Sequence, residues 1–183
     1  MKLPSDLQRI MVVGGSGAGK STFAAALARR LRLPVIHMDA LFWRPGWIMA
    51  PEAEFLQSVR IEADRERWVM DGNYSRTWPD RLTRADAVIF LDMPTWLRCW
   101  RVLGRYWQNR GRTRPDLGAG CPEKLDLDFL FNWVLRYRWR GRPKALNLMT
   151  ADGPAATLHR VRLRSPRAVQ RFLAEVAQPQ DSQ

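Results

Sequence analysis

The stretch VVGGSGAGKSTF, from Val12 to Phe23, decides the fold that this sequence predicts. The pattern G-x-x-x-x-G-K-[ST] is complete within it, at Gly14, Gly19, Lys20 and Ser21. In this pattern the glycines let backbone N–H groups point at phosphate oxygens, the lysine reaches the β- and γ-phosphates, and the hydroxyl binds Mg²⁺. The stretch therefore predicts a phosphate-binding loop for a nucleoside triphosphate.

The residues on either side of this loop agree with that interpretation. Residues 10–13 form a short apolar run before it, and STFAAALARRL after it is rich in alanine and leucine, with Phe23, Leu27 and Leu31 four residues apart. A strand, a loop and a helix are predicted in that order, with the N-terminus of the helix directed at the anion. A dinucleotide-binding fingerprint is excluded, because it would need glycine at Thr22.

The composition indicates a single domain, expected at residues 1–178 with a disordered tail at residues 179–183. With 183 residues, 46% of them hydrophobic, the chain is long enough for one well-buried core and short for two. The apolar runs are far shorter than a membrane span and the N-terminus lacks the apolar core of a signal peptide, so we expect a cytoplasmic protein without a membrane partner. Cys99 and Cys121 belong to no C-x-x-C motif, so a zinc site is not expected.

The charge is strongly positive and is carried mainly by arginine. The formal net charge is +12, and 26 of the 30 basic residues are arginine. Between Asp92 and Asp116 the sequence has no acidic residue but has six arginines, at positions 98, 101, 105, 110, 112 and 114. This segment is either a phosphate-binding surface, which would use the planar guanidinium groups, or a solvated basic face without a specific ligand.

Apolar runs alternate with helical patterns along the chain. Strands are predicted at residues 10–13, 35–38, 67–74 with a break at Gly72, 87–91 and 157–163. Helices are predicted at residues 21–31, from Pro51, from Pro94, from Pro122 and after Ser165 as N-cap. The run at 87–91 is apolar without alternation, which is typical of a strand covered by helices on both sheet faces. The predicted fold is a three-layer α/β structure with a five-stranded, doubly wound parallel sheet.

Three carboxylates, Asp39, Asp71 and Asp92, each stand where a predicted strand ends. Because ligands of such sheets bind at the carboxyl ends of the strands, the three are expected near the phosphate loop. For each one alone, a helix-capping or turn role is equally compatible with the sequence.

The tryptophans fall into two groups. Trp96, Trp100 and Trp107 have helical spacing, which predicts that they pack in the core. Trp43 and Trp47 flank a predicted loop, where stacking on a substrate ring and packing within the loop are both compatible with the sequence.

Five segments of the sequence resemble the adenylate-kinase-like group of P-loop kinases and, more closely, the bacterial DNA topology modulation (FlaR-related) proteins of that fold. They are GGSGAGKST, HMDALFW after the second strand, DGNY after the third, FLDMP at the fourth, and GCPEKLDLDFLFNW after the basic segment. The resemblance implies a P-loop fold with a short arginine-rich lid. It also argues against AMP as the acceptor, because Asp71-Gly72-Asn73-Tyr74 stands where adenylate kinases have a Gly-Phe-Pro-Arg type motif.

The resemblance further implies roles for the matching positions. ATP would be bound by the phosphate loop, at Gly14, Gly15, Ser16, Gly17, Ala18, Gly19, Lys20, Ser21 and Thr22. Catalytic roles would fall to Lys20, Asp39, Arg110 and Arg114, with the arginines in a lid at about residues 108–124, and Mg²⁺ would be bound by Ser21 and Asp92. From the resemblance together with the positions of these residues in the sequence, we expect the acceptor to lie against the segment at about residues 41–66 and to contact Asp39, Trp43, Arg44, Asp71, Asn73, Tyr74, Arg76 and Arg112.

Two classes of function follow from these observations. The first is an ATP- and Mg²⁺-dependent phosphotransferase acting on a nucleotide or another small acceptor. A hydroxyl acceptor would need a base such as Asp39, whereas a phosphate acceptor would use arginines such as Arg44 or Arg76. The second is a nucleotide-dependent regulatory protein that acts on DNA, which the family resemblance and the net charge suggest. The sequence leaves the acceptor, a nucleic-acid partner and the oligomeric state open.

Overall fold

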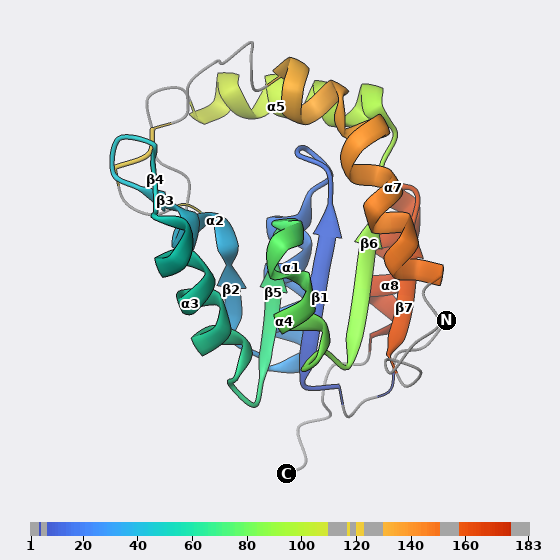
Figure 1. The fold of residues 1–183 in the computed structure, drawn as a ribbon. Coiled ribbons are helices and arrows are strands. Elements are labelled where there is room, and N and C mark those ends of the chain that lie inside the picture. The colour runs from blue at the N-terminus through green and yellow to red at the C-terminus, as the bar shows by residue number, and fades with distance from the viewer. Residues whose placement is uncertain are drawn as a thin grey trace.

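A five-stranded parallel sheet forms the centre of the protein in the computed structural model, which describes residue 4 and residues 7–109, 117, 120–122, 130–150 and 158–176 (Figure 1). Its strands are β1 (Arg9–Gly14), β2 (Val35–His37), β5 (Trp68–Asp71), β6 (Ala87–Leu91) and β7 (His159–Leu163). The order across the sheet is β2-β5-β1-β6-β7, with all neighbours parallel. The loop after β1 therefore opens at the position where the strand order reverses, which is where open α/β sheets bind ligands.

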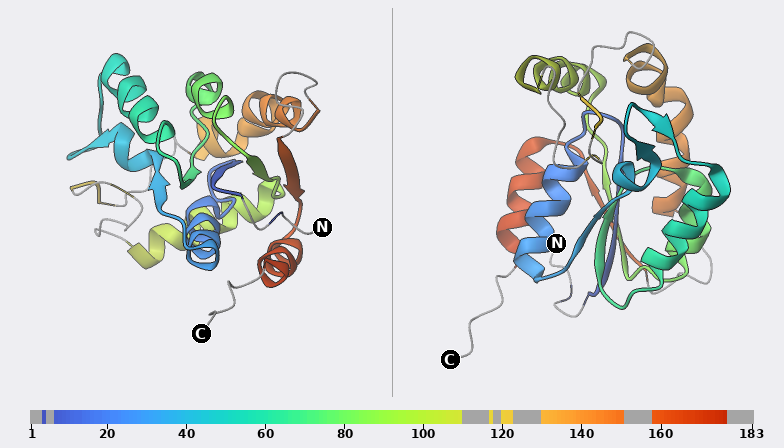
Figure 2. Two further views of the ribbon diagram at one scale, coloured as in Figure 1. Left: turned by 90° about the horizontal axis from the view of Figure 1, so that it is seen from below. Right: turned by 90° about the vertical axis from the view of Figure 1, so that its left-hand side faces the viewer.

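Helices cover both faces of the sheet, as Figure 2 shows. On one face, α1 (Lys20–Leu31) and α8 (Pro166–Glu175) pack over Ile10 and Val12 of β1. On the other face, α3 (Glu52–Ala63), α4 (Trp78–Leu82) and α7 (Tyr137–Thr150) pack over Met11 and Val13. Successive residues of β1 thus point into opposite cores, and the side chains that β1 contributes to each core are apolar. The predicted three-layer fold is confirmed.

Several short elements were not predicted. Helix α2 (Met38–Phe42) begins directly after β2, so the strand predicted at residues 35–38 ends one residue earlier. A hairpin of β3 (Trp43–Arg44) and β4 (Ile48–Met49) replaces the predicted loop, and the 3₁₀ helix η1 (Ser75–Thr77) precedes α4. The hairpin turn has positive φ at Gly46 (80°) and Trp47 (62°). These elements of two to five residues are too short to show a periodic pattern.

The core position predicted for three tryptophans is wrong. Helix α5 (Thr95–Asn109) forms as expected after Pro94, but Trp96, Trp100 and Trp107 are 71%, 73% and 71% exposed. The helix instead buries Arg98 and Val102. Helical spacing identifies residues that share a face but does not say which face is covered. Here the covered face carries arginine because it lies against the phosphate loop.

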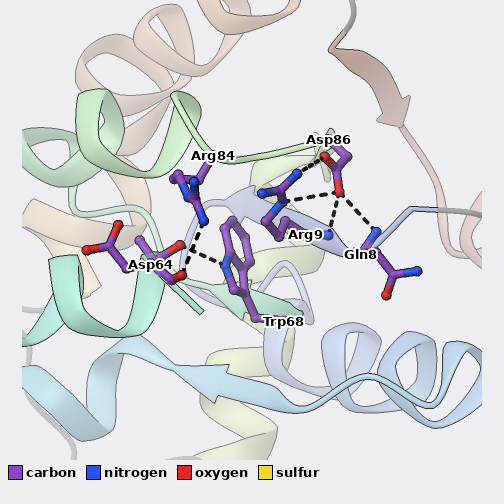
Figure 3. Close-up of polar contacts among 7 residues, drawn as sticks. Gln8, Arg9, Asp64, Trp68, Arg84 and Asp86 are labelled. Atoms are coloured by element: carbon purple, nitrogen blue, oxygen red, sulfur yellow. Dashed lines mark hydrogen bonds and ion pairs between the residues drawn. The ribbon is translucent and has the colours of Figure 1, made fainter. Parts of the chain in front are cut away.

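Polar contacts hold the strands together at the end of the sheet opposite the phosphate loop (Figure 3). The Asp86 carboxylate accepts hydrogen bonds from the backbone N–H groups of Gln8 (3.0 Å) and Arg9 (2.8 Å), and Arg9 Nη2 donates to its other oxygen (2.9 Å). The indole N–H of Trp68 donates to the Ala63 carbonyl oxygen (3.2 Å). Burial by itself raises the pKa of Asp86, but the contacts with Arg9 and the backbone outweigh it and leave that pKa lowered.

The remaining described element is η2 (Leu130–Leu135), a π-helix that packs against α5 and leads into α7. The helix predicted from Pro122 lies partly outside the described residues. The lid arginines Arg110, Arg112 and Arg114 and the predicted tail lie wholly outside them. Within the part of the chain that the structure describes, no helix combines the length and the apolar character needed to cross a membrane.

Candidate active site

The phosphate loop runs from the end of β1 to the start of α1, and its glycines have conformations that other residues adopt poorly. Gly17 and Gly19 have φ values of 79° and 90°. A Cβ atom on Gly17 would stand 2.4 Å from the backbone oxygen of Arg98, so a side chain has no room there. Helix α1 begins at Lys20 and carries no acidic residue in its first turn. The positive end of that helix thus faces the loop without a competing carboxylate.

Two arginines of α5 lie directly against this loop. Arg101 Nη1 donates to the carbonyl oxygen of Ala18 (3.1 Å). The Arg98 guanidinium lies next to Gly15, where an added Cβ would meet Nη1 at 2.4 Å, and its carbon is 4.8 Å from the ring centroid of Tyr137. Sequence reasoning placed both arginines in a basic segment but did not assign them to the site. The lack of acidic residues in that segment was the only feature of the sequence that pointed to these two arginines.

Arg98 is only 2% exposed, and not all of its nitrogen atoms have a hydrogen-bond partner among the described residues. Nη2 donates to Thr95 Oγ1 (3.3 Å), whereas the buried Nε and Nη1 atoms have no hydrogen-bond partner in the described part of the chain. Burial lowers the pKa of Arg98, and the neighbouring charges oppose that shift. Unpartnered buried donors are costly unless a ligand engages them. Together with the glycine cradle, they fit a polyphosphate group such as that of ATP.

The DGNY segment after β5 joins the phosphate loop to the neighbouring strand. Asn73 Oδ1 accepts a hydrogen bond from the backbone N–H of Gly14 (2.9 Å). The backbone of the segment is held in turn by the fully buried Arg81, whose Nη1 and Nη2 donate to the carbonyl oxygens of Gly72 (3.0 Å) and Asn73 (2.7 Å). Burial lowers the pKa of Arg81, and the Asp71 charge opposes that shift. The side chain of Asn73 therefore helps to position the phosphate loop, and its contact with the substrate stays a prediction.

Asp39 and Tyr74, both predicted to contact the acceptor, lie next to each other. The Tyr74 hydroxyl donates to Asp39 Oδ1 at 2.6 Å. Burial, followed by the charges of Asp39 and Asp71, raises the pKa of Tyr74, so this hydroxyl stays protonated and remains a donor. The Tyr74 ring packs 4.9 Å from the rings of both Phe42 and Phe55, measured between centroids. The Asp39 carboxylate is thus positioned by a rigid aromatic neighbour.

The other described residues that were predicted on the acceptor side contact protein groups, and Arg112 lies outside the described residues. Trp43 and Trp47 pack edge to face (5.4 Å), and the Trp47 indole donates to the Pro122 carbonyl oxygen (2.9 Å). Arg44 pairs with Glu54 and Arg76 with Glu52, both on the surface. Asp71 Oδ1 lies 2.6 Å from Nδ1 of His37 on the adjacent strand.

Asp92 follows β6 and lies in a cluster with two arginines. Arg142 Nε donates to Oδ1 (2.8 Å), and Arg162 donates to Oδ2 through Nε (3.0 Å) and Nη2 (2.5 Å). Burial raises the pKa of Asp92, but the two guanidinium groups outweigh it and leave that pKa lowered. No cluster of three metal-binding side chains occurs among the described residues. The metal role of Asp92 stays a prediction, and Mg²⁺ would compete with both arginines for the same oxygens.

Asp92→Asn is expected to lower the free energy of unfolding by about 1–3 kcal/mol at pH 7, because two guanidinium groups lose their charged acceptor. The pKa is lowered in the folded state, so this contribution is present above about pH 4 and is lost as the pH falls through the folded-state value. Urea unfolding at several pH values measures it. Asp80→Asn, which removes a surface pair with Arg60, should cost less than about 0.5 kcal/mol. If the two variants lost the same free energy of unfolding, the stabilising role of the Asp92 cluster would be contradicted.

The comparison with solved structures defines the class of fold. No protein-family model matches the chain. A shikimate kinase from Acinetobacter baumannii in complex with shikimate aligns with a TM-score of 0.58 at 17% identity over 94% of both chains. A gluconokinase from Sinorhizobium meliloti 1021 aligns with a TM-score of 0.51 at 18% identity, covering 96% of this chain and 91% of that one. The fold is that of the P-loop kinases.

A relative that is similar in sequence shows the family to which the chain belongs. The uncharacterized protein YqaC of Bacillus subtilis (strain 168) is 31% identical over 134 residues, which cover 71% of this chain and 72% of YqaC. The chain belongs to the YqaC family. The solved structures confirm the predicted P-loop kinase fold, while the more specific resemblance to the DNA topology modulation proteins stays a prediction.

Proposed function

We propose that this protein is a kinase that transfers the γ-phosphoryl group of ATP to a hydroxyl group of a small acceptor. The observation that carries the proposal is the pair of hydrogen bonds made by two consecutive residues of the DGNY segment. Asn73 binds the phosphate loop at Gly14, and Tyr74 binds the Asp39 carboxylate. One short segment thus sets the position of a carboxylate relative to a phosphate cradle, which is the requirement for phosphoryl transfer to a hydroxyl.

On the nucleotide side, Lys20 and the backbone of residues 14–22 hold the phosphates, and Ser21 supplies a hydroxyl ligand for Mg²⁺. The guanidinium group of Arg98, with its two nitrogen atoms that are unpartnered within the described ranges, adds positive charge beside Gly15. Arg110 and Arg114 are proposed to complete this charge from the lid, and Arg112 to face the acceptor. Mg²⁺ supplies further neutralisation of the phosphate charge when it is bound. These groups act by positioning and by electrostatic stabilisation.

On the acceptor side, Asp39 takes the proton of the attacking hydroxyl. A bond forms between that oxygen and the γ-phosphorus, the bond from the γ-phosphorus to the β–γ bridging oxygen breaks, and ADP leaves. The aromatic rings of Phe42 and Trp43, 4.9 Å apart between centroids, contribute an apolar wall beside α2. A hydroxyl acceptor is favoured over a nucleotide phosphate because Arg44 and Arg76, the expected phosphate ligands, are paired with glutamates.

A screen for the acceptor tests this proposal. ATP consumption and transfer of γ-label are followed with nucleosides and sugar acids, which offer hydroxyl groups, and with nucleoside monophosphates, which offer phosphate. Transfer to a hydroxyl compound is the expected result. Exclusive transfer to a nucleoside monophosphate would contradict the role of Asp39 as a base and favour Arg44 and Arg76 as acceptor ligands.

Ser21→Ala is expected to raise the Mg²⁺ concentration needed for tight ATP binding by roughly 10- to 100-fold, the size typical of a lost partner at a metal site. Calorimetric titrations of ATP at increasing Mg²⁺ measure this shift. Ser165→Ala is the matched control, because that hydroxyl accepts from Ala168 N (3.2 Å) and caps α8. The control should lose about 1 kcal/mol of stability and keep the Mg²⁺ dependence. An unchanged Mg²⁺ titration for Ser21→Ala would exclude the ligand role.

A further inference from the structure

The outer face of α5 carries a line of exposed apolar side chains, here called the α5 tryptophan stripe: Trp96, Trp100, Leu103 and Trp107. They follow one another at intervals of four, three and four residues, so they share one side of the helix. Leu103 is 37% exposed, and each tryptophan is more than 70% exposed. Since Arg98 and Arg101 contact the phosphate loop, the stripe faces away from the active site. A continuous apolar line of this size marks an interaction surface.

The element that packs against α5 extends this surface. Phe131 and Trp133 of η2 are 58% and 66% exposed, and Trp139 in the first turn of α7 is 68% exposed. Figure 1 shows α5 lying across one end of the molecule, with the start of α7 at the same end. The cations in this part of the chain are also exposed, namely Arg136, Arg138, Arg140 and Lys144.

The charged side chains that the structure describes around the stripe are all positive. Among the described residues between positions 93 and 150, none is acidic. Arg142 is held by Asp92 and is not part of the exposed set. A partner of this surface must therefore offer negative charge next to an apolar region.

We propose that the α5 tryptophan stripe binds the surface of an anionic phospholipid bilayer. Indole rings prefer the boundary between headgroups and acyl chains, because they combine an apolar body with one polar N–H group. A helix with one apolar face lies in the plane of that boundary, and nearby arginine and lysine side chains are attracted to an anionic leaflet. The exposed cations Arg136, between η2 and α7, and Arg138, Arg140 and Lys144, in α7, are the groups that would contact the headgroups.

Two other partners fit the surface less well. Single-stranded nucleic acid stacks its bases on aromatic rings but needs cations along the same line for its phosphates. On α5, Arg98 and Arg101 contact the phosphate loop instead. A second copy of the chain would bring equal positive charges together.

This proposal differs from the sequence-based expectation of no membrane partner. That expectation rested on the lack of a run long enough to span a bilayer. An interfacial helix needs no such run, because it lies parallel to the membrane surface.

The test measures co-sedimentation with lipid vesicles. Wild-type protein is expected to bind vesicles of phosphatidylcholine with 30% phosphatidylglycerol, and to bind pure phosphatidylcholine vesicles at least about tenfold less tightly. High salt should weaken the binding. The triple variant Trp96→Ser/Trp100→Ser/Trp107→Ser should lose at least about tenfold in affinity. The matched control Ile48→Ser/Met49→Ser/Ile61→Ser removes three residues that are 62%, 63% and 58% exposed on β4 and α3, and it should bind as wild type.

A second measurement uses the unmodified chain, so the test does not depend on the folding of a variant. Lipids brominated on their acyl chains should quench the tryptophan fluorescence of wild-type protein in anionic vesicles. The proposal is overturned if wild-type protein does not bind anionic vesicles. It is overturned as well if the control variant on β4 and α3 loses as much affinity for them as the tryptophan variant. It is also overturned if the tryptophan variant abolishes only self-association, measured by ultracentrifugation, or only binding of single-stranded DNA.

Discussion

Lys20→Ala is expected to lower the rate of phosphoryl transfer by about 100- to 1,000-fold, the size of effect seen when one preorganised charge-stabilising donor is removed. The ammonium group neutralises charge on the β- and γ-phosphates, and a methyl group cannot replace it. The backbone cradle of the phosphate loop should persist, because its shape depends on Gly17, Gly19 and the contact between Asn73 and Gly14. Steady-state turnover with the acceptor found in the screen measures the loss.

Lys144→Ala is the matched control for this variant. It removes the same group from an exposed position on α7 and should leave turnover unchanged. Wild-type turnover in Lys20→Ala would contradict the assignment of the phosphate loop. Loss of folding, detected by thermal unfolding, would show instead that Lys20 is a structural residue.

Asp39→Asn is expected to lower turnover by about 100- to 10,000-fold, the usual contribution of a general base. The amide keeps the size of the side chain, and its oxygen can still accept from the Tyr74 hydroxyl, but it cannot take a proton from the acceptor. ATP affinity should therefore hold while catalysis falls. Parallel measurements of turnover and of ATP binding separate the two effects.

Asp80→Asn serves as the control, because the Asp80 side chain makes only a surface pair with Arg60 among the described contacts. If the stability of Asp39→Asn falls while its turnover is kept, Asp39 is a capping residue of α2 and not a catalytic one. If both ATP affinity and turnover fall, the carboxylate acts on the nucleotide side.

The sequence predicted the parts of the fold in which a local pattern is complete. The phosphate loop was evident because its glycines, lysine and serine have fixed spacing, and β6 was predicted at its observed bounds because an unbroken apolar run ends at Asp92. The cap of α8 was also predicted, and Ser165 Oγ accepts from Ala168 N. Each of these features depends on neighbours in the sequence.

Features that depend on contacts between distant segments were missed or predicted wrongly. Arg98 was not assigned to the site, because its burial beside Gly15 depends on how α5 crosses the phosphate loop. The tryptophans of α5 were predicted on the buried face, because the sequence does not show which face of α5 lies against the phosphate loop. The hydrogen bond that the Asn73 amide oxygen accepts from Gly14 was also missed, because it joins residues 59 positions apart, while the predicted contact of Asn73 with the acceptor stays a prediction.

The most direct test of the proposed kinase identifies the phosphorus-containing product. Wild-type protein is incubated with γ-labelled ATP, Mg²⁺ and the acceptor pool, and the labelled products are separated and analysed by phosphorus NMR. The proposed function predicts label in a phosphate monoester, C–O–P, that Asp39→Asn does not form. Label found only in inorganic phosphate, or only in a phosphoanhydride such as a nucleoside diphosphate, would contradict transfer to a hydroxyl.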